Sequence, residues 1–228
     1  MKSTVSESVK AKCDEFVGNF NNSVTSQATR NNFHNKTWKE SDRKLLEITE
    51  HTLNTHGEIW CNPAFESSVS LSEQSEGIYI SDIIMPLLRS NLGNLLNGSI
   101  CLSTAEHQSI ASKTRRNAGV GKERMGLLKH DGKIVEFMFA ECSRIICCNS
   151  KKDDDDVKLW RETLDGMSFI DPTGNQFGVV GIQVAGTTIR LNILVRNLGG
   201  IPRYFHLDHA EIPLSHTYYT LKLLFVYY

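Results

Sequence analysis

Several common sequence signatures are missing from this chain of 228 residues. It contains no Cys-x-x-Cys pair, which disfavours a zinc ribbon as the explanation of its 6 cysteines. The first residues lack the apolar segment of a secretory signal, and no apolar run approaches the roughly 20 residues that span a bilayer. We therefore expect an intracellular protein with reduced thiols and no membrane partner. The sequence leaves the cytoplasm and the nucleus open as compartments.

The chain also lacks an excess of charge of either sign. It has 25 basic and 26 acidic residues and a formal net charge of -1, so a basic footprint for nucleic acid must be local. A local set of basic residues does precede residue 125: Lys113, Arg115, Arg116, Lys122 and Arg124. In a nucleic-acid-binding protein these side chains would contact phosphates. The alternative, which stays open, is that they cap a helix and solvate a loop.

Other site patterns are missing or incomplete. Gly119-x-Gly121-Lys122 lacks the preceding strand and the spacing of a phosphate-binding loop, and no Ser-His-Asp set stands out. His206, Asp208 and His209 form a short cluster of metal-ligand types. On a strand, alternation would place His206 and Asp208 on one face and His209 on the other. At most two of the three would then meet one ion, and surface or paired histidines are the favoured interpretation.

Hydrophobic periodicity predicts four main helices. They are expected near residues 9–20, over 38–55, over 77–96 with a kink or break at Pro86, and from the acidic run at 153–156 onward. In the last helix Val157, Trp160, Leu164 and Met167 are expected to form the buried stripe. Residues 61–75 are expected to form a Ser-rich loop.

The strand pattern is clearest around Asp131-Gly132, which predicts a hairpin between residues 125–130 and 133–143. The second of these strands is apolar on both faces, as in a central strand covered on both sides. Three further strands are expected at 178–184, 188–195 and 204–212. The chain should therefore be an α/β protein, with a mixed central sheet flanked by helices. We expect a helical extension and linker over residues 1–37 and one domain over 38–228.

Glu141 is the residue that most needs an explanation, because it ends a run of apolar strand residues. A carboxylate there is costly unless it is paired or bound to a metal. Glu123 stands just before the first hairpin strand, so the hairpin can bring the two carboxylates together. Two carboxylates and water suit Mg²⁺ in the hydrolysis of a phosphodiester. The alternative is a structural ion pair between Glu141 and an arginine such as Arg144.

The order of helix, hairpin with an acid, strand ending in an acid, helix and strand resembles the PD-(D/E)XK nuclease superfamily, over about residues 76–184. The resemblance implies a restriction-endonuclease-like core and a nucleic-acid-directed enzyme that uses Mg²⁺. It places the first acid of the motif on Glu123 and the (D/E)-x-K motif on Glu141-Cys142-Ser143. An acid on the first core helix joins the site in this fold, and Glu76 is the matching residue.

A closer resemblance, over roughly residues 38–215, is to a lineage-expanded fungal group of uncharacterised proteins related to Crinkler-type effectors. It rests on the segments EGIYISDIIMPLL, CLSTAEHQSIASKTRRNAG, MGLLKHDGKIVEFMFAECSR, DDDDVKLWRETLDGMS and GIPRYFHLDHAEIPL. Before the hairpin that group has a segment similar to Lys-Pro-Asp-Val-Met-Gly, whereas this chain has Lys-Glu-Arg-Met-Gly at 122–126. The activity of that group is inferred rather than established.

Two departures from the motif bear on activity. Glu123 replaces an aspartate, which changes the reach by one methylene, and Ser143 replaces the lysine that stabilises charge or positions the attacking water. That lysine can migrate in the superfamily, and Lys158 on the following helix is the obvious substitute; alternatively, Lys158 is an ordinary solvated residue. Arg144 points to the opposite strand face from Ser143 and is a poor replacement.

Three functions therefore stay open. The chain is a metal-dependent phosphodiester hydrolase, or a catalytically inactive domain on the same scaffold that binds nucleic acid or protein. A third alternative is a protein scaffold that docks partners through the apolar segment Leu221–Tyr228.

Overall fold

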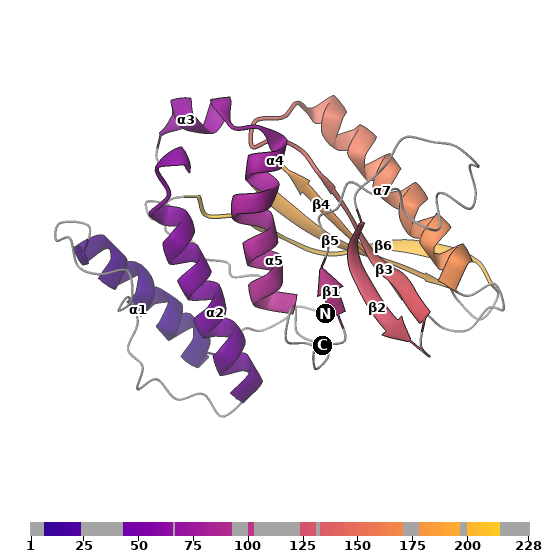
Figure 1. The fold of residues 1–228 in the computed structure, drawn as a ribbon, viewed down its shortest axis with the longest axis horizontal. Coiled ribbons are helices and arrows are strands. Elements are labelled where there is room, and N and C mark those ends of the chain that lie inside the picture. Colours follow the sequence, from indigo (N-terminus) through magenta and orange to yellow (C-terminus); the bar gives the residue numbers. More distant parts are fainter. Residues whose placement is uncertain are drawn as a thin grey trace.

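The fold is built around a six-stranded mixed sheet (Figure 1). The computed structural model describes residues 7–23, 43–65, 67–92, 100–102, 124–130, 133–170, 178–196 and 200–214. The strands are β1 (Ile100–Leu102), β2 (Arg124–His130), β3 (Lys133–Cys142), β4 (Gly178–Ala185), β5 (Thr188–Arg196) and β6 (Pro202–Glu211), and they lie in that order across the sheet. Among the strands of the described residues, β3 and β4 are the one parallel pair. The expected α/β class with a mixed sheet is confirmed.

The parallel pair is joined by helix α7 (Asn149–Ile170), which returns the chain across one face of the sheet. Parallel strands need such a crossover because a tight turn cannot connect them. Leu159 and Met167 of α7 pack there with Phe139 of β3, Val179 of β4 and Leu194 of β5. This face of the sheet is called the α7 face below.

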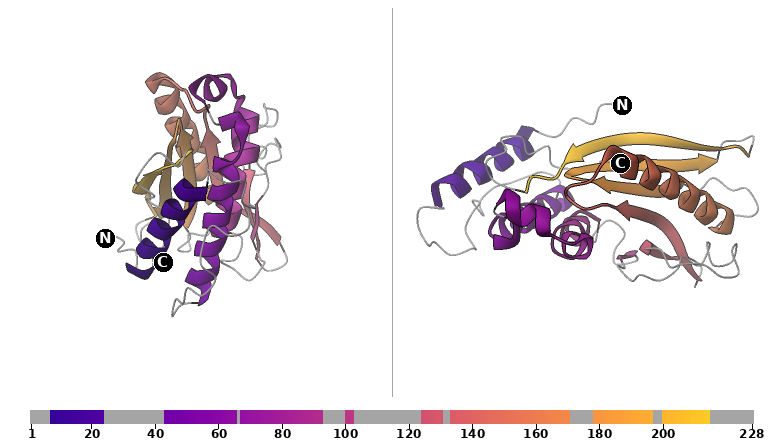
Figure 2. Two further views of the ribbon diagram at one scale, coloured as in Figure 1. Left: turned by 90° about the vertical axis from the view of Figure 1, so that its left-hand side faces the viewer. Right: turned by 90° about the horizontal axis from the view of Figure 1, so that it is seen from above.

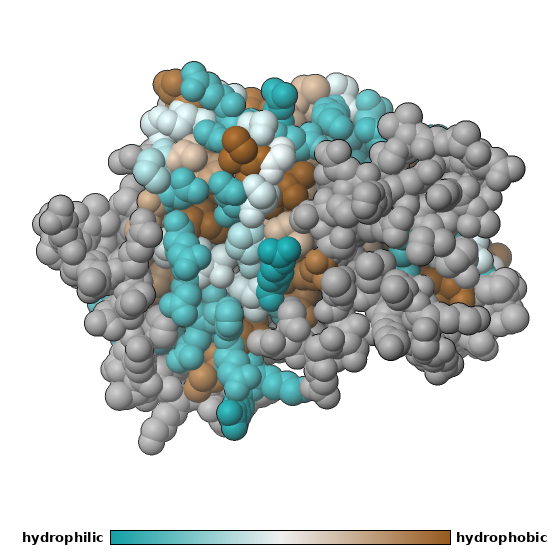
Figure 3. All heavy atoms as spheres, viewed as in Figure 1, coloured by the Kyte–Doolittle hydropathy of each residue, from teal (hydrophilic) through white to brown (hydrophobic). Residues whose placement is uncertain are grey.

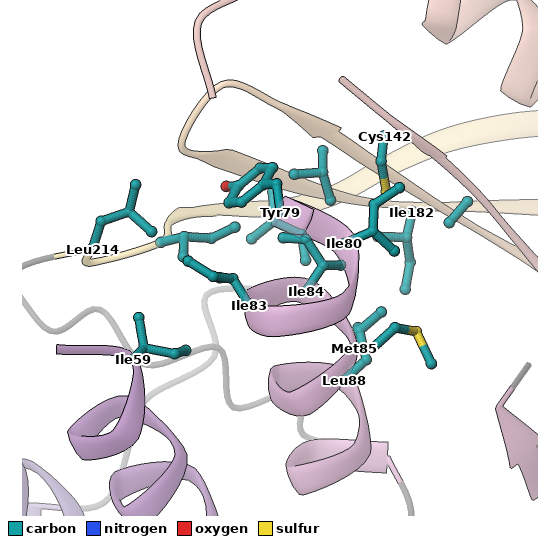
Figure 4. Packing of buried hydrophobic residues seen from close by; sticks show 14 of the residues in the cluster. Ile59, Tyr79, Ile80, Ile83, Ile84, Met85, Leu88, Cys142, Ile182 and Leu214 are labelled. Carbon is teal, nitrogen blue, oxygen red and sulfur yellow. The ribbon is translucent and has the colours of Figure 1, made fainter. Parts of the chain in front are cut away.

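A continuous helical run covers the opposite face of the sheet, as the left-hand view of Figure 2 shows. It consists of α4 (Glu76–Tyr79), the π-helical segment η2 (Ile80–Ile84) and α5 (Met85–Leu92). Its apolar residues pack on strand residues such as Cys142 and Ile182 (Figure 4). The Tyr79 hydroxyl donates to the carbonyl oxygen of Gly186 at 2.9 Å, which fixes the start of this run against the turn between β4 and β5.

Pro86 does not end this helix, although a kink or break was expected there. A helical proline lacks the N–H that would bond the carbonyl four residues earlier. Here the π-helical segment ends at Ile84, two residues before Pro86, and the N–H of Met85 bonds the carbonyl of Ile80 five residues back. The wider turn changes the hydrogen-bond pattern next to the proline, so the chain remains helical through it.

The N-terminal helices pair with each other and with the sheet layer. Helix α1 (Glu7–Ser23) contacts α2 (Arg43–Trp60) through a small apolar cluster that includes Phe16 and Leu53. The indole N–H of Trp60 donates to the carbonyl oxygen of Pro213 at 2.7 Å, tying α2 to the chain after β6. The expected boundary at residues 37–38 lies outside the described residues. Figure 3 shows hydrophilic side chains gathered along α2 on the outer surface.

The expected loop after α2 is wrong. The segment 61–75 is not a simple loop, because it contains the 3-10 turn η1 (Pro63–Phe65) and the short helix α3 (Ser68–Glu73). The Ser67 hydroxyl accepts from the N–H of Ser70 and caps α3, so its serines favour a helix start rather than a loop.

Among the helices of the described residues, none is long and apolar enough to cross a membrane.

Helix α7 also differs from its expected form. It begins at Asn149, four residues before the acidic run, so the aspartates do not occupy its first turn. Val157 and Trp160 of the expected buried stripe are 48% and 42% exposed. Met167 of that stripe is buried and Leu164 packs against the same cluster, as expected. The buried side also carries Asp155, Leu159, Glu162 and Thr163. Asp155 can be buried on this face because its carboxylate has hydrogen-bond partners on the sheet and within its own helix.

Candidate functional site

Glu141 lies near the end of β3, opposite Gln183 of β4 in the parallel register. Alternation along β3 places it on the same side as Phe139, which belongs to the α7 face. The Glu141 side chain is partly buried, whereas Gln183 is fully buried and donates from Nε2 to the carbonyl oxygen of Lys152 at 2.7 Å. The acid therefore stands where β3 meets the first turn of α7.

Ser143, at the position of the lysine in the (D/E)-x-K motif, is fixed at the end of β3. Its N–H donates to the carbonyl oxygen of Val184 at 2.8 Å, which extends the β3–β4 pairing by one residue. Its side chain is 1% exposed, and its hydroxyl donates to Oδ2 of Asp155 at 2.5 Å. The strand end and the second turn of α7 are thus joined by a buried hydrogen bond.

Asp155 also gathers two lysines of its own helix. Lys151 Nζ lies 2.6 Å from Oδ1 of Asp155, and Lys158 Nζ lies 3.1 Å from the same oxygen. The spacings of four and three residues put both lysines on the helix face of Asp155. The Asp155 side chain is 0% exposed while each lysine side chain is 40% exposed. The carboxylate is therefore buried beneath two ammonium groups that reach solvent.

The electrostatics of this cluster follow from its partners. Burial by itself would raise the pKa of Asp155, but hydrogen bonds from Lys151, Ser143 and Lys158 outweigh it and hold the pKa below its ordinary value. The pKa of Lys151 is raised, mainly by its hydrogen bond to Asp155, with a smaller contribution from the charge of Glu76. One carboxylate and two ammonium groups give this group of three side chains a net positive charge of one.

The structure connects two of the expected site residues to the Asp155 cluster, whose central members were not expected. Glu76, the first residue of α4, acts electrostatically on Lys151, and Lys158 contacts Asp155. Arg124 opens β2 and pairs in register with Phe139, two residues before Glu141 on β3. Five other expected residues lie outside the described residues: Lys113, Arg115, Arg116, Lys122 and Glu123. The pairing of Glu123 with Glu141 therefore stays a prediction.

A metal site is not complete within the described residues, where no three His, Cys, Asp or Glu side chains are grouped to hold an ion. Glu123, the expected partner of Glu141, is not among them. The carboxylate of Glu141 has the oxygen donors that Mg²⁺ prefers, but Mg²⁺ needs further ligands. A role for Glu141 as a metal ligand therefore stays a prediction.

Asp155 and Lys151 were not selected from the sequence. The acidic run was interpreted as a favourable helix start, and this interpretation treated its four aspartates alike. It did not single out Asp155, which is buried against the sheet. The pattern Lys-x-x-x-Asp-x-x-Lys at 151–158 does place three charges on one helix face. That pattern could have indicated the cluster, but most such patterns lie on solvated faces.

The expected arrangement of the histidines on β6 is wrong. A bulge shifts the register, so that Asn192 pairs with His206 while Leu191 pairs with Asp208. The extra residue brings His209 to the face of His206, with ring centroids 5.7 Å apart, and leaves Asp208 opposite Leu191. His206 Nδ1 donates to Oδ1 of Asn192 at 3.1 Å, because an amide oxygen only accepts. His206 is a paired surface histidine, as favoured from the sequence.

Comparison with known proteins identifies no relative of this chain. No protein family, no curated protein and no solved structure matches it. The interpretation of the site therefore rests on the geometry of the described residues.

Proposed function

We propose that this protein is a nucleic-acid-directed module of the PD-(D/E)XK type that hydrolyses phosphodiester bonds with Mg²⁺. The observation that supports the proposal is the order and pairing of the elements around Glu141. A helical run, α4 to α5, precedes the antiparallel strands β1, β2 and β3, and α7 then connects β3 to the parallel strand β4. This order resembles the restriction-endonuclease-like core, with Glu141 near the end of the strand that carries the second acid.

In this proposal Glu141 and Glu123 hold Mg²⁺, and Glu76 assists from the start of α4. The bound metal would orient the phosphodiester and lower the pKa of a water molecule. The positive charge that the motif lysine normally supplies would come from the α7 lysines, of which Lys158 was the substitute expected from the sequence. Lys113, Arg115, Arg116, Lys122 and Arg124 are proposed to contact phosphates of the substrate.

A second function is a catalytically inactive interaction domain on the same scaffold. It is favoured by the Ser143–Asp155 hydrogen bond, which occupies the motif-lysine position with a buried neutral group. Ion pairs that lock both lysines to one carboxylate are also common in purely structural networks. Such a domain would bind nucleic acid or another protein without cleaving it.

Calorimetric titration with Mg²⁺ and with Mn²⁺ tests the metal site. We expect the native protein to bind, and Glu141→Ala and Glu123→Ala each to weaken the affinity by about tenfold or more, because each removes a charged oxygen ligand. Glu58→Ala is the matched control, since Glu58 is an exposed acid on α2 and should not alter the affinity. A native protein that binds neither metal, or an unchanged affinity in Glu141→Ala, would contradict the metal site.

Cleavage assays separate the two functions. Single- and double-stranded DNA and RNA should be incubated with the native protein and with Glu141→Ala in the presence of Mg²⁺. Cleavage that is lost in Glu141→Ala supports the hydrolase. Metal binding without cleavage of any of these substrates would favour the inactive interaction domain.

A further inference from the structure

We propose that Lys151, rather than Lys158, supplies the positive charge that Ser143 cannot carry. The buried Ser143–Asp155 pair would hold the Lys151 ammonium group in position. This inference rests on the proposed function and names a further residue of the same site. Lys151 would contact the substrate phosphate, whereas Asp155 would be a positioning residue that acts through it.

The first argument is the way in which the cluster is anchored. Ser143 occupies the motif-lysine position, two residues after Glu141, and its hydroxyl holds one oxygen of Asp155. The Ser143 and Asp155 side chains are 1% and 0% exposed, so this pair cannot turn outward into solvent. The other oxygen of Asp155 then fixes Lys151 at 2.6 Å. The buried Ser143–Asp155 pair thus connects the position of the motif lysine to the ammonium group of Lys151 on the neighbouring helix.

The second argument distinguishes the two lysines. Both are 40% exposed and both contact Oδ1 of Asp155, but Lys151 lies nearer, at 2.6 Å against 3.1 Å. Lys151 also feels the charge of Glu76, the acid that is expected to assist the site. Lys151 is thus connected to Ser143 through Asp155, and the charge of Glu76 raises its pKa further.

The third argument is the balance of charge. Asp155 carries one negative charge and the two lysines that contact it carry two positive charges, so one positive charge is not balanced within this group of three side chains. An ammonium group held in place at the edge of a buried carboxylate stabilises negative charge that develops on a phosphate without first having to be ordered. That is the task of the lysine that Ser143 replaces.

The catalytic part is tested by comparing Lys151→Ala with Lys158→Ala, a matched pair with the same partner and the same exposure. In the cleavage assay we expect Lys151→Ala to lower kcat by about a hundredfold with little change in KM or metal affinity, and Lys158→Ala to lower kcat by less than about threefold. Lys151→Arg should keep more activity than Lys151→Ala, because the charge remains. Equal losses in the two alanine variants, or a larger loss in Lys158→Ala, would overturn the assignment while leaving the hydrolase function in place.

Restoring a lysine at residue 143 tests the same role through a gain of activity. A purely structural role of Lys151 would not explain such a gain. The double variant Ser143→Lys with Lys151→Ala should recover about tenfold or more of the kcat lost in Lys151→Ala, because the new ammonium can pair with Asp155. No recovery in a folded double variant would count against the shared role of these two positions.

The positioning part has a readout that needs neither metal nor substrate. In ¹H–¹⁵N spectra of the lysine side chains, an ammonium group held by a buried carboxylate exchanges slowly and gives a visible signal. We expect such a signal from Lys151 in the native protein, its loss in Asp155→Asn and its weakening in Ser143→Ala, which keeps the carboxylate. If the native protein cleaves nothing, the proposed function and the catalytic part fail together, and these spectra still decide whether Asp155 holds Lys151. An unchanged Lys151 signal in both variants would overturn the positioning part.

Discussion

Lowering the pH from 6.5 to about 4 is expected to remove about 3 kcal/mol of stability through His56 alone. His56 is 4% exposed on α2, and burial lowers the pKa of its imidazole from 6.5 to about 4. The folded protein therefore binds the proton more weakly than the unfolded chain does. The contribution is fully present above pH 6.5 and is lost as the pH falls through this window, because protonation then favours the unfolded chain.

Urea unfolding at a series of pH values measures this effect. The difference in unfolding free energy between the native protein and His56→Leu should change across the window, since the leucine variant lacks the titrating group. His51→Leu is the matched control, because His51 lies on the same helix and is exposed. It should leave the pH dependence as in the native protein. A native protein and a His56→Leu variant with parallel pH profiles would show that His56 does not titrate in this way.

Gly166→Ala is expected to destabilise the protein by about 2 kcal/mol or more, although alanine is the better helix former. A Cβ atom at residue 166 would lie 2.4 Å from Cε2 and 2.7 Å from Cζ of Phe139. The Phe139 ring is fully buried between α7 and the sheet, so neither side can yield without opening the core. Overpacking there costs more than the roughly 1 kcal/mol that alanine contributes to an isolated helix.

The same substitution at Gly18 should have the opposite sign. Gly18 is an exposed residue of α1, and nothing lies within 4 Å of the position of its missing Cβ. Gly18→Ala should therefore stabilise the protein by about 0.5–1 kcal/mol through helix propensity and chain entropy. Urea unfolding of the two variants at one pH makes the comparison. A shift in the same direction for both would mean that α7 does not pack on Phe139 as described.

Five of the six strands that the structure describes were predicted from the sequence, whereas β1 (Ile100–Leu102) was not. The hairpin around Asp131-Gly132 and the strands β4 and β5 lie within a residue or two of their expected bounds. Their signals are local, because apolar runs and turn residues act over a few neighbours. Gly186, in the turn between β4 and β5, has a φ of 66°, which an L-residue with a side chain rarely adopts.

The helices were harder to predict where their buried side depends on partners far away in the sequence. The buried stripe expected for α7 counted only apolar residues, yet Asp155 is buried because Ser143 and two lysines satisfy it. The histidines of β6 were misplaced for a similar reason, since a one-residue bulge in the pairing with β5 reverses the expected alternation.

For the candidate site, the sequence by itself determined which residues need an explanation. Glu141 stands out because a carboxylate within an apolar strand needs a partner, and Ser143 stands out because it lacks the charge that the motif requires. The spacing at 151–158 places Lys151, Asp155 and Lys158 on one helix face, but only the tertiary structure decided that Ser143 holds Asp155 and that this face is buried. The physical reason is that the Ser143–Asp155 hydrogen bond and the Asp155 carboxylate become buried only when α7 packs across the end of β3. A local pattern of residues does not predict that packing.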